Sequence, residues 1–407
     1  MTNDQEQGRT EYDIGQIFRD HRREYERNHS MSKEQRKVLH DLCVCRTDFL
    51  GGHLYECSNQ CGYEQPAYNS CRNRHCPKCQ GIAMRQWVEQ RLEELLPVPY
   101  FHNVSSMPHA FNVLIPYNES LMYNLLFEAT STAIRQQARK ELNGQVGVIA
   151  VLHTWGQQLF RHVHVHCLIT GGALSSDRTQ WNPASRTYLM DVYELSAEFK
   201  KAFCQGLQKA YDRGKLIFVH PEAAHLKKPE AFESFLTTER KQAWSVYSKK
   251  PFAGPAKIVE YMGRYTHRVA ISNRRILAVT DTHITFDYKD NRDLDAQGAP
   301  RHKQRTLPVE TFMTLFLQHT LPKGFRKIRY FGFLGGSHRS RNIETCRSLI
   351  IKQGIAEPVV FSELDPLQQE HLCPNCGMTL RIKERLLPKR SRAPAVTSEA
   401  RRYRDVA

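Results

Sequence analysis

The stretch VGVIAVLHTWGQQLFRHVHVHCLIT, residues 146–170, decides the fold of this chain. Residues 146–153 are almost all apolar, which is typical of a buried strand, whereas residues 161–170 alternate strictly between polar and apolar side chains. Only a short polar turn separates the two segments, and two strands joined in this way favour an antiparallel hairpin. The sequence therefore predicts two neighbouring antiparallel strands at the centre of a sheet.

The alternating strand places its histidines on one face. Successive side chains of a strand point to opposite faces, so the core face takes Val163, Val165, Cys167 and Ile169. The opposite face takes His162, His164 and His166. A lone histidine here is usually a satisfied polar group, but His164 and His166 lie about 6.5–7 Å apart along the strand and can lean onto one ion. We predict that they bind a divalent metal, and the absence of cysteine on that face leaves positions open for substrate, as in catalytic sites.

The rest of the chain adds helices and further short strands to this hairpin. Helices are expected at 119–142, 193–213, 229–248 and 308–319, and a further one begins near Pro255. Strand-like stretches are FHNVSSM (101–107), RVAIS (268–272), RRILAVT (274–280) and THITFDY (282–288). This pattern predicts an α+β fold with a mainly antiparallel sheet flanked by helices, spanning 98–335.

Cysteines concentrate before this domain. Seven of the twelve lie between Cys43 and Cys79, and clustered cysteines in a chain without an export signal are more often metal ligands than disulfides. We expect structural Zn²⁺ in a Cys-rich domain over 43–97, since the segment has too few apolar residues for a core of its own. One four-ligand set would be Cys71, His75, Cys76 and Cys79, and a second Cys45, His53, Cys57 and Cys61, although the ligands can also interleave.

The two ends of the chain are expected to be simpler. A helical segment, with one helix over 11–42, occupies 1–42. Residues 336–380 carry Cys373 and Cys376, a half-site that either shares ligands with a distant segment or binds nothing. Residues 381–407 are rich in Lys, Arg and Pro and are expected to form a basic flexible tail.

Composition limits the function classes. With 407 residues, 40% hydrophobic, the chain has enough apolar residues for two or three domains and is not intrinsically disordered. The formal charge of +16 favours a polyanionic partner, and nucleic acid is the first candidate. No run of apolar residues is long enough to span a membrane, and the polar N-terminus resembles no targeting signal, so a cytoplasmic, DNA-associated protein is expected.

A pair of tyrosines forms a second candidate site. Tyr261 and Tyr265 are four residues apart in the helix expected from Pro255, so they project from one face. From spacing alone, simple packing of both rings is the more common reason for such a pair. The surrounding basic residues are candidates for DNA contact: Arg264, Arg268, Arg274 and Arg275. The third ligand of the histidine metal is left open between His109 and His267.

Three segments together resemble one known family. SCRNRHCPKCQ (70–80), HVHCLITGG (164–172) and YMGRYTHRVAISNRRI (261–276) resemble, in order, motifs of the two-tyrosine rolling-circle transposases of the insertion-sequence-ninety-one family. These are HUH endonucleases, and the resemblance implies that His164 and His166 are the metal pair and that Tyr261 and Tyr265 are the nucleophiles. It also implies an HUH endonuclease-type fold after a zinc domain, Mg²⁺ or Mn²⁺ at the histidines, and single-stranded transposon ends and target as substrates. The chain would nick and rejoin DNA through a 5′-phosphotyrosine intermediate.

Three rival functions remain open on the sequence. A plasmid rolling-circle replication initiator or relaxase uses the same nicking chemistry for another purpose. A non-catalytic, zinc-dependent DNA-binding regulator explains the cysteines and the charge, but leaves the histidine strand without a role. A metallohydrolase of the HxHxDH type is disfavoured, because Cys167 and Leu168 follow His166 in place of an Asp-His pair. The sequence does not indicate which oligomeric state the protein adopts.

Overall fold

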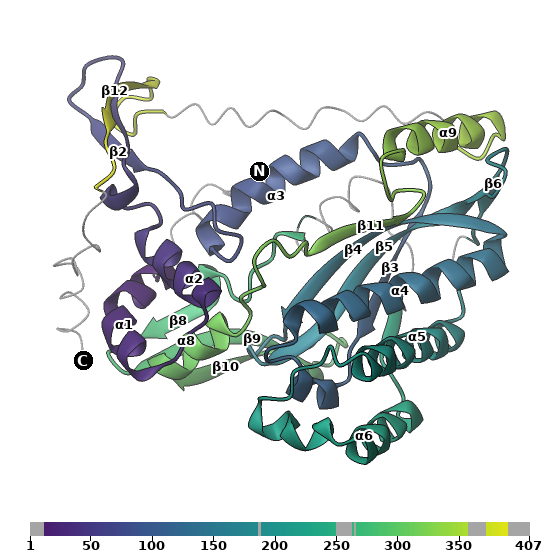
Figure 1. Ribbon diagram of the computed structural model, residues 1–407. Helices are drawn as coiled ribbons and strands as arrows, with labels where there is room; N and C mark the ends of the chain where they lie inside the picture. Colours follow the sequence, from purple (N-terminus) through teal and green to yellow (C-terminus); the bar gives the residue numbers. More distant parts are fainter. Residues whose placement is uncertain (1–11, 186–188, 250–262, 264–265, 357–371, 390–407) are drawn as a thin grey trace.

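The computed structural model describes residues 12–185, 189–249, 263, 266–356 and 372–389. In these ranges the chain is a mixed α+β protein whose sheets are antiparallel and flanked by helices, which confirms the predicted class. Figure 1 shows the large sheet with helices above and below it, and two smaller sheets towards the other end of the molecule.

The large sheet contains the predicted hairpin at its centre. Its strands run in the order β11-β4-β5-β3-β7, with β6 paired to β5, and every pairing is antiparallel. The strands are β3 (Tyr100–Ser106), β4 (Gly144–Trp155), β5 (Arg161–Ser175), β6 (Trp181–Pro183), β7 (Val246–Lys249) and β11 (Ile328–Gly332). The two strands of the hairpin, β4 and β5, are longer than expected, and both are buried over most of their length.

Helices cover both faces of the large sheet (Figure 1). The main core lies between one face and the helices α4 (Glu119–Leu142), α5 (Val192–Asp212) and α6 (Pro229–Lys241). Val163, Val165, Cys167 and Ile169 belong to this core, so the alternation of β5 has the predicted polarity. The opposite face packs against the end of α3 (Pro77–Leu92) and against α9 (Arg339–Lys352).

Two smaller sheets complete the fold. The strands β8 (Ile276–Val279), β9 (His283–Leu294) and β10 (Pro300–Pro308) form one sheet, which packs on α1 (Ile14–Asn28), α2 (Lys33–Val44) and α8 (Val309–Leu317). The other has the order β12-β1-β2 and consists of β1 (Gly52–Cys57), β2 (Glu64–Tyr68) and β12 (Leu380–Leu386).

Several expected elements differ from the observed ones. The helix expected over 11–42 is two helices, because Ser32 and Gln35 form a reciprocal capping box that starts α2 anew. The helix expected over 229–248 ends at Lys241, and Val246–Lys249 is strand β7. Residues 268–272 are not in a strand. The prediction of a flexible basic tail from residue 381 is wrong at the start of that segment, since the strand Leu380–Leu386 pairs with β1.

Candidate active site and metal centres

The register of the β4–β5 hairpin brings a third histidine to the predicted pair. Val151 lies opposite His166, and His153 lies opposite His164. Residues opposite one another in adjacent antiparallel strands have neighbouring side chains on the same face. The turn between the strands is short, so the strand register can be estimated from the sequence. That register is the signal that points to His153.

The three-histidine group consists of His153, His164 and His166. Their candidate ligand nitrogens all lie within 4.8 Å of one another, and the Nε2 atoms of His164 and His166 are 3.1 Å apart. Two imidazole nitrogens that each sit about 2.1 Å from one ion are separated by roughly 3.0–3.4 Å. The donor set and its spacing therefore fit a divalent metal ion.

Burial keeps the imidazoles of His164 and His166 neutral. His164 and His166 are 9% and 7% exposed. Burial lowers the pKa of His164 to about 3, and it lowers the pKa of His166 well below its ordinary value. A neutral imidazole has a free lone pair at neutral pH, which is the form that binds a metal.

A further histidine orients the group from the neighbouring strand. His102 on β3 has its Nε2 2.9 Å from His166 Nδ1, so the Nε2 of His166 is directed towards His164. The Nδ1 of His164 lies 2.8 Å from the backbone carbonyl of His162, which fixes that ring. Contacts of this kind set the tautomer and direction of ligating imidazoles.

The three-histidine group opens into a small basic pocket. The pocket has a volume of about 240 Å³, and its lining includes the three histidines, Arg268 and Arg275. Arg275 also donates to the carbonyls of Asp287 and Gln157 at 2.7 and 2.5 Å, so it holds the pocket wall as well as adding charge. Of the other predicted DNA contacts, Arg274 is exposed outside this lining, and Arg264 lies outside the described residues.

Neither expected third ligand belongs to the group. His109 hydrogen-bonds Asn112 at 3.3 Å and stacks on His162, with 5.3 Å between ring centroids. His267 lies 2.9 Å from the hydroxyl of Thr266, and its ring contacts Trp87 of α3. Among the residues that the structure describes, His153 occupies the third position instead.

The tyrosines Tyr261 and Tyr265 lie outside the described residues. Their described neighbours do have defined surroundings. Gly263 lies so close to α3 that a Cβ there would be 2.6 Å from Val88 Cγ2. Thr266 is fully buried, and Arg268 already lines the histidine pocket. Gly263 is therefore in contact with α3, and Arg268 is in the lining of the pocket.

The cysteines form two four-thiol groups that differ from the sets expected from the sequence. The first cysteine group is Cys45, Cys71, Cys76 and Cys79, and the second is Cys57, Cys61, Cys373 and Cys376. In each group the four Sγ atoms lie within 4.8 Å of one another. The ligands of the 43–79 segment do interleave, and the half-site at Cys373 and Cys376 finds its partners in β1 and the loop after it.

The two histidines expected as zinc ligands lie in neither group. His75 is half-buried, and its Nε2 accepts a hydrogen bond from the backbone amide of Leu321. Its neighbour Arg74 donates to the carbonyls of Leu321, Pro322 and Phe325. The pair thus joins the cysteine-rich segment to the loop before β11. His53 lies on β1, where its ring contacts Tyr55.

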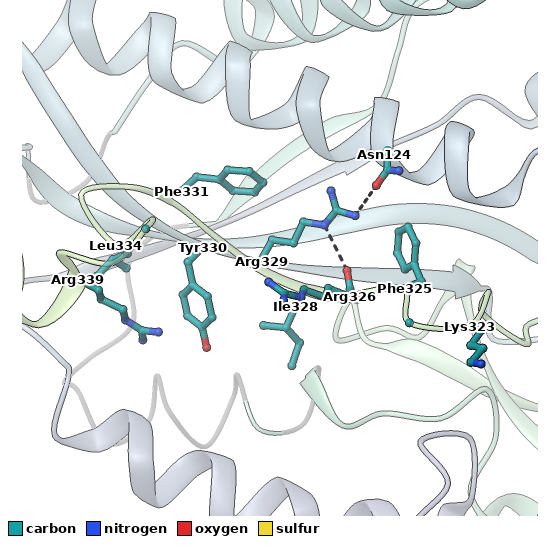
Figure 2. Close-up of a pocket in the computed structure, with 12 residues that line it drawn as sticks. Asn124, Lys323, Phe325, Arg326, Ile328, Arg329, Tyr330, Phe331, Leu334 and Arg339 are labelled. Atoms are coloured by element: carbon teal, nitrogen blue, oxygen red, sulfur yellow. Dashed lines mark hydrogen bonds between the residues drawn. The ribbon is translucent and has the colours of Figure 1, made fainter. Parts of the chain in front are cut away.

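A larger basic pocket lies beside the edge strand β11, and we call it the edge pocket. Figure 2 shows Arg326, Arg329, Arg339 and Lys323 around it, together with the rings of Tyr330 and Phe331. Its volume is about 650 Å³. Arg329 is held in place by Asn124 and by the ring of Phe127, whose centroid is 4.2 Å from its guanidinium carbon.

Comparisons with known proteins agree with this architecture. Residues 147–342 match a family model described as "Putative transposase", and residues 17–107 match the model "Transposase zinc-binding domain". The protein "Putative transposase y4qJ" of Sinorhizobium fredii (strain NBRC 101917 / NGR234) is 43% identical over 341 residues, covering 83% of this chain and 84% of the relative. The "Transposase for insertion sequence element IS801" of Pseudomonas savastanoi pv. phaseolicola is 29% identical over 298 residues, covering 72% of this chain and 68% of the relative.

These findings define the class of the protein first: it is a transposase, an enzyme that acts on DNA, with a zinc-binding domain near its N-terminus. More narrowly, the chain belongs to the IS91 family of insertion-sequence transposases. No solved structure matches the chain. No helix within the described ranges is both long and apolar enough to cross a bilayer.

Proposed function

We propose that this transposase nicks and rejoins single-stranded DNA at the ends of its insertion sequence through a 5′-phosphotyrosine intermediate, as in rolling-circle transposition. The observation that carries the proposal is the group of three buried histidines that line a basic pocket. The order of the motifs supports it as well, because the tyrosine segment leads directly into Arg268 of that pocket.

His153, His164 and His166 would hold Mg²⁺ or Mn²⁺, with His102 orienting His166. When bound, such an ion polarises a phosphodiester and stabilises the charge that develops on the leaving oxygen. The histidines supply only three ligands, so positions remain for phosphate oxygens. Arg268 and Arg275 add positive charge on the pocket wall, where it attracts the DNA backbone.

Tyr261 and Tyr265 are the proposed nucleophiles. The phenolic oxygen attacks the phosphorus, the bond between phosphorus and the 3′ oxygen breaks, and the phenolic proton ends on the free 3′ hydroxyl. The DNA keeps its phosphodiester energy in the tyrosine ester, so rejoining needs no external energy source. The second tyrosine can hold a second strand end during exchange.

The direct test is mass spectrometry of the covalent adduct formed with single-stranded oligonucleotides that carry the element ends, in Mg²⁺ or Mn²⁺. The wild-type chain should give a peptide that contains Tyr261 or Tyr265 linked to the 5′ phosphate. Tyr261→Phe with Tyr265→Phe should abolish the adduct, while Tyr193→Phe, a change at an exposed helical tyrosine, should leave it unchanged. An intact adduct in the double variant would overturn the assignment of nucleophiles.

The same assay separates the rival functions. A plasmid replication initiator or relaxase would cleave plasmid origin or transfer-origin sequences in preference to the element ends. A zinc-dependent regulator would retain DNA without cleaving it in any metal. The three-histidine group favours an enzyme over a regulator, because DNA binding alone does not require buried imidazoles with metal-ligand spacing around an open pocket.

A further inference from the structure

We propose that Cys57, Cys61, Cys373 and Cys376, the second cysteine group, form a structural Zn²⁺ site that joins the two ends of the chain. The matched zinc-binding domain covers residues 17–107, so it contains the whole first cysteine group but only half of the second. The other half comes from a segment more than 300 positions further along the chain, since Cys57 and Cys376 are separated by 319 positions.

The separations between sulfur atoms fit a metal and exclude disulfides. Cys57 and Cys376 are 3.3 Å apart, Cys61 and Cys373 are 3.5 Å apart, and Cys61 and Cys376 are 3.8 Å apart. A disulfide needs about 2.05 Å. Four thiolates at about 2.3 Å from a central Zn²⁺ are separated by roughly 3.8 Å along each tetrahedral edge. The group needs only small shifts to reach that geometry.

The backbone at each cysteine pair forms a tight knuckle. Gly62 follows Cys61 and Gly377 follows Cys376, and both glycines have positive φ values, of 82° and 74°. A positive φ is readily adopted by glycine, and it lets the chain reverse directly after the second thiol. The two knuckles are joined by the amide of Ser58, which donates to the carbonyl of Thr379 at 3.0 Å. The two halves are therefore held with their thiols facing one another.

The small sheet around this group has no apolar core of its own. Within the described ranges, none of the three hydrophobic core clusters includes a residue of β1, β2 or β12. Contacts between the halves are the β1–β12 ladder and exposed ion pairs, such as Arg381 with Glu56. An exposed ion pair contributes about 0–1 kcal/mol, and a three-stranded sheet without an apolar face is not stable alone. A bound Zn²⁺ would supply the missing stabilisation, as it does in small zinc domains.

The chemistry of the group selects zinc. Its donors are four thiols with no imidazole or carboxylate among the described ligand candidates, and a closed set of four thiolates is a structural rather than a catalytic site. Cys61 and Cys376 are exposed, so an ion can enter from solvent without opening a core.

The test is the zinc content of the full chain, measured by inductively coupled plasma mass spectrometry. Cys373→Ser with Cys376→Ser should remove one zinc ion per chain, and so should Cys57→Ser with Cys61→Ser. Combining all four substitutions should remove no more than that one ion, because the two pairs share it. Asn375→Ala changes the same knuckle but keeps its thiols, and it should retain the wild-type content.

Unchanged zinc content after Cys373→Ser with Cys376→Ser would overturn the proposal, as would the loss of two ions in the fourfold variant. A variant of the first group, Cys71→Ser with Cys79→Ser, should lower the zinc content independently of the second group. Additive losses from the two groups would show that neither variant loses zinc through general unfolding. The measurement needs no DNA, so its outcome is independent of the proposed nicking reaction.

A second readout tests the joining of the chain ends. A protease recognition sequence inserted between Ala356 and Leu372 lets the C-terminal part be cut from the rest of the full-length protein. After cleavage, the C-terminal fragment should co-elute with the body on gel filtration, and a zinc chelator should release it. Release without the chelator would show that zinc does not hold the two ends together.

Discussion

His153 is the residue on which the metal centre depends most directly, because it completes a set that His164 and His166 only begin. Loss of a residue that hydrogen-bonds a metal ligand typically lowers metal affinity or activity by about 10–100-fold. Loss of a ligand itself is expected to lower them at least as far. We therefore expect His153→Ala to reduce Mn²⁺-dependent cleavage by about 100-fold or more. Binding of single-stranded DNA should change little.

His109→Ala and His267→Ala are the matched controls, since both residues lie near the pocket but outside the group. Each should retain its Mn²⁺ affinity, as measured by isothermal titration. If His109→Ala or His267→Ala loses the ion and His153→Ala keeps it, the third ligand has been placed wrongly.

A buried histidine away from the metal group should make stability fall in acid. His319 is buried between Thr154 and the carbonyl of Leu159, at 3.2 and 2.9 Å. Burial lowers its pKa to about 3 from an ordinary value near 6.5, so the folded state favours the neutral ring. Its contribution is fully present above pH 6.5 and is lost as the pH falls towards 3, by up to a few kcal/mol at about 1.4 kcal/mol per pH unit.

Urea unfolding between pH 7 and pH 4 measures this effect as the slope of the unfolding free energy against pH. The slope should be smaller in His319→Gln than in the wild type. His283→Gln, a change at an exposed histidine, should leave the slope unchanged. Equal slopes in all three proteins would contradict the assignment of His319 as a residue that is buried neutral.

Among the contacts between elements, that of Gly263 with α3 leaves little room for a side chain. A Cβ on Gly263 would lie 2.6 Å from Val88 Cγ2 and 3.2 Å from Met84 Cγ. Helix propensity favours alanine over glycine by about 1 kcal/mol, but overpacking typically costs about 1–3 kcal/mol. Because Val88 is short and stiff, we expect the steric cost to dominate, so Gly263→Ala should lower both the melting temperature and the cleavage rate.

Val88→Ala removes the clashing atom and should restore part of the cleavage rate when it is combined with Gly263→Ala. A double-mutant cycle on the unfolding free energy gives the coupling between the two positions. Additive effects would mean that Gly263 is required for some reason other than its contact with α3.

The elements also show which features could be predicted from the sequence. Local signals sufficed for the β4–β5 hairpin, for α4 and for the facing of His164 and His166, because period and turn length are properties of neighbouring residues. The capping box at Ser32 and Gln35 is a local signal too, and it divides into two the single helix expected over 11–42.

Pairings between distant segments could not be predicted in the same way. The partnership of β1 with β12 joins residues more than 300 positions apart, and several groupings of the cysteines satisfy the same ligand spacing. Likewise, His75 has the sequence spacing of a zinc ligand, but its Nε2 accepts a hydrogen bond from the amide of Leu321. No local sequence pattern reveals this contact.

At the scale of the whole molecule, the charge of +16 favours binding of the proposed DNA substrate, and four basic side chains line the edge pocket. The edge pocket borders β11, and the amide of Leu152, next to His153, donates to the carbonyl of Lys327 at 2.9 Å. A single strand bound along β11 would therefore run towards the three-histidine group. Aromatic rings beside a basic groove suit a strand whose bases are unpaired and can stack (Figure 2).

Lys323 and Arg326 are the exposed charges of this pocket, and no ion pair in the described ranges involves either. Each cation that neutralises a phosphate of single-stranded DNA contributes about 0.7 to the slope of log K against log salt. Lys323→Ala with Arg326→Ala should therefore weaken binding of a single-stranded oligonucleotide and reduce that slope by roughly 1.4. Fluorescence anisotropy at several salt concentrations measures both quantities. Lys140→Ala with Arg240→Ala removes the same charge from residues paired with carboxylates elsewhere, and it should leave the slope nearly unchanged. If both double variants reduce the slope equally, the DNA responds to net charge alone and the edge pocket is not its path to the histidines.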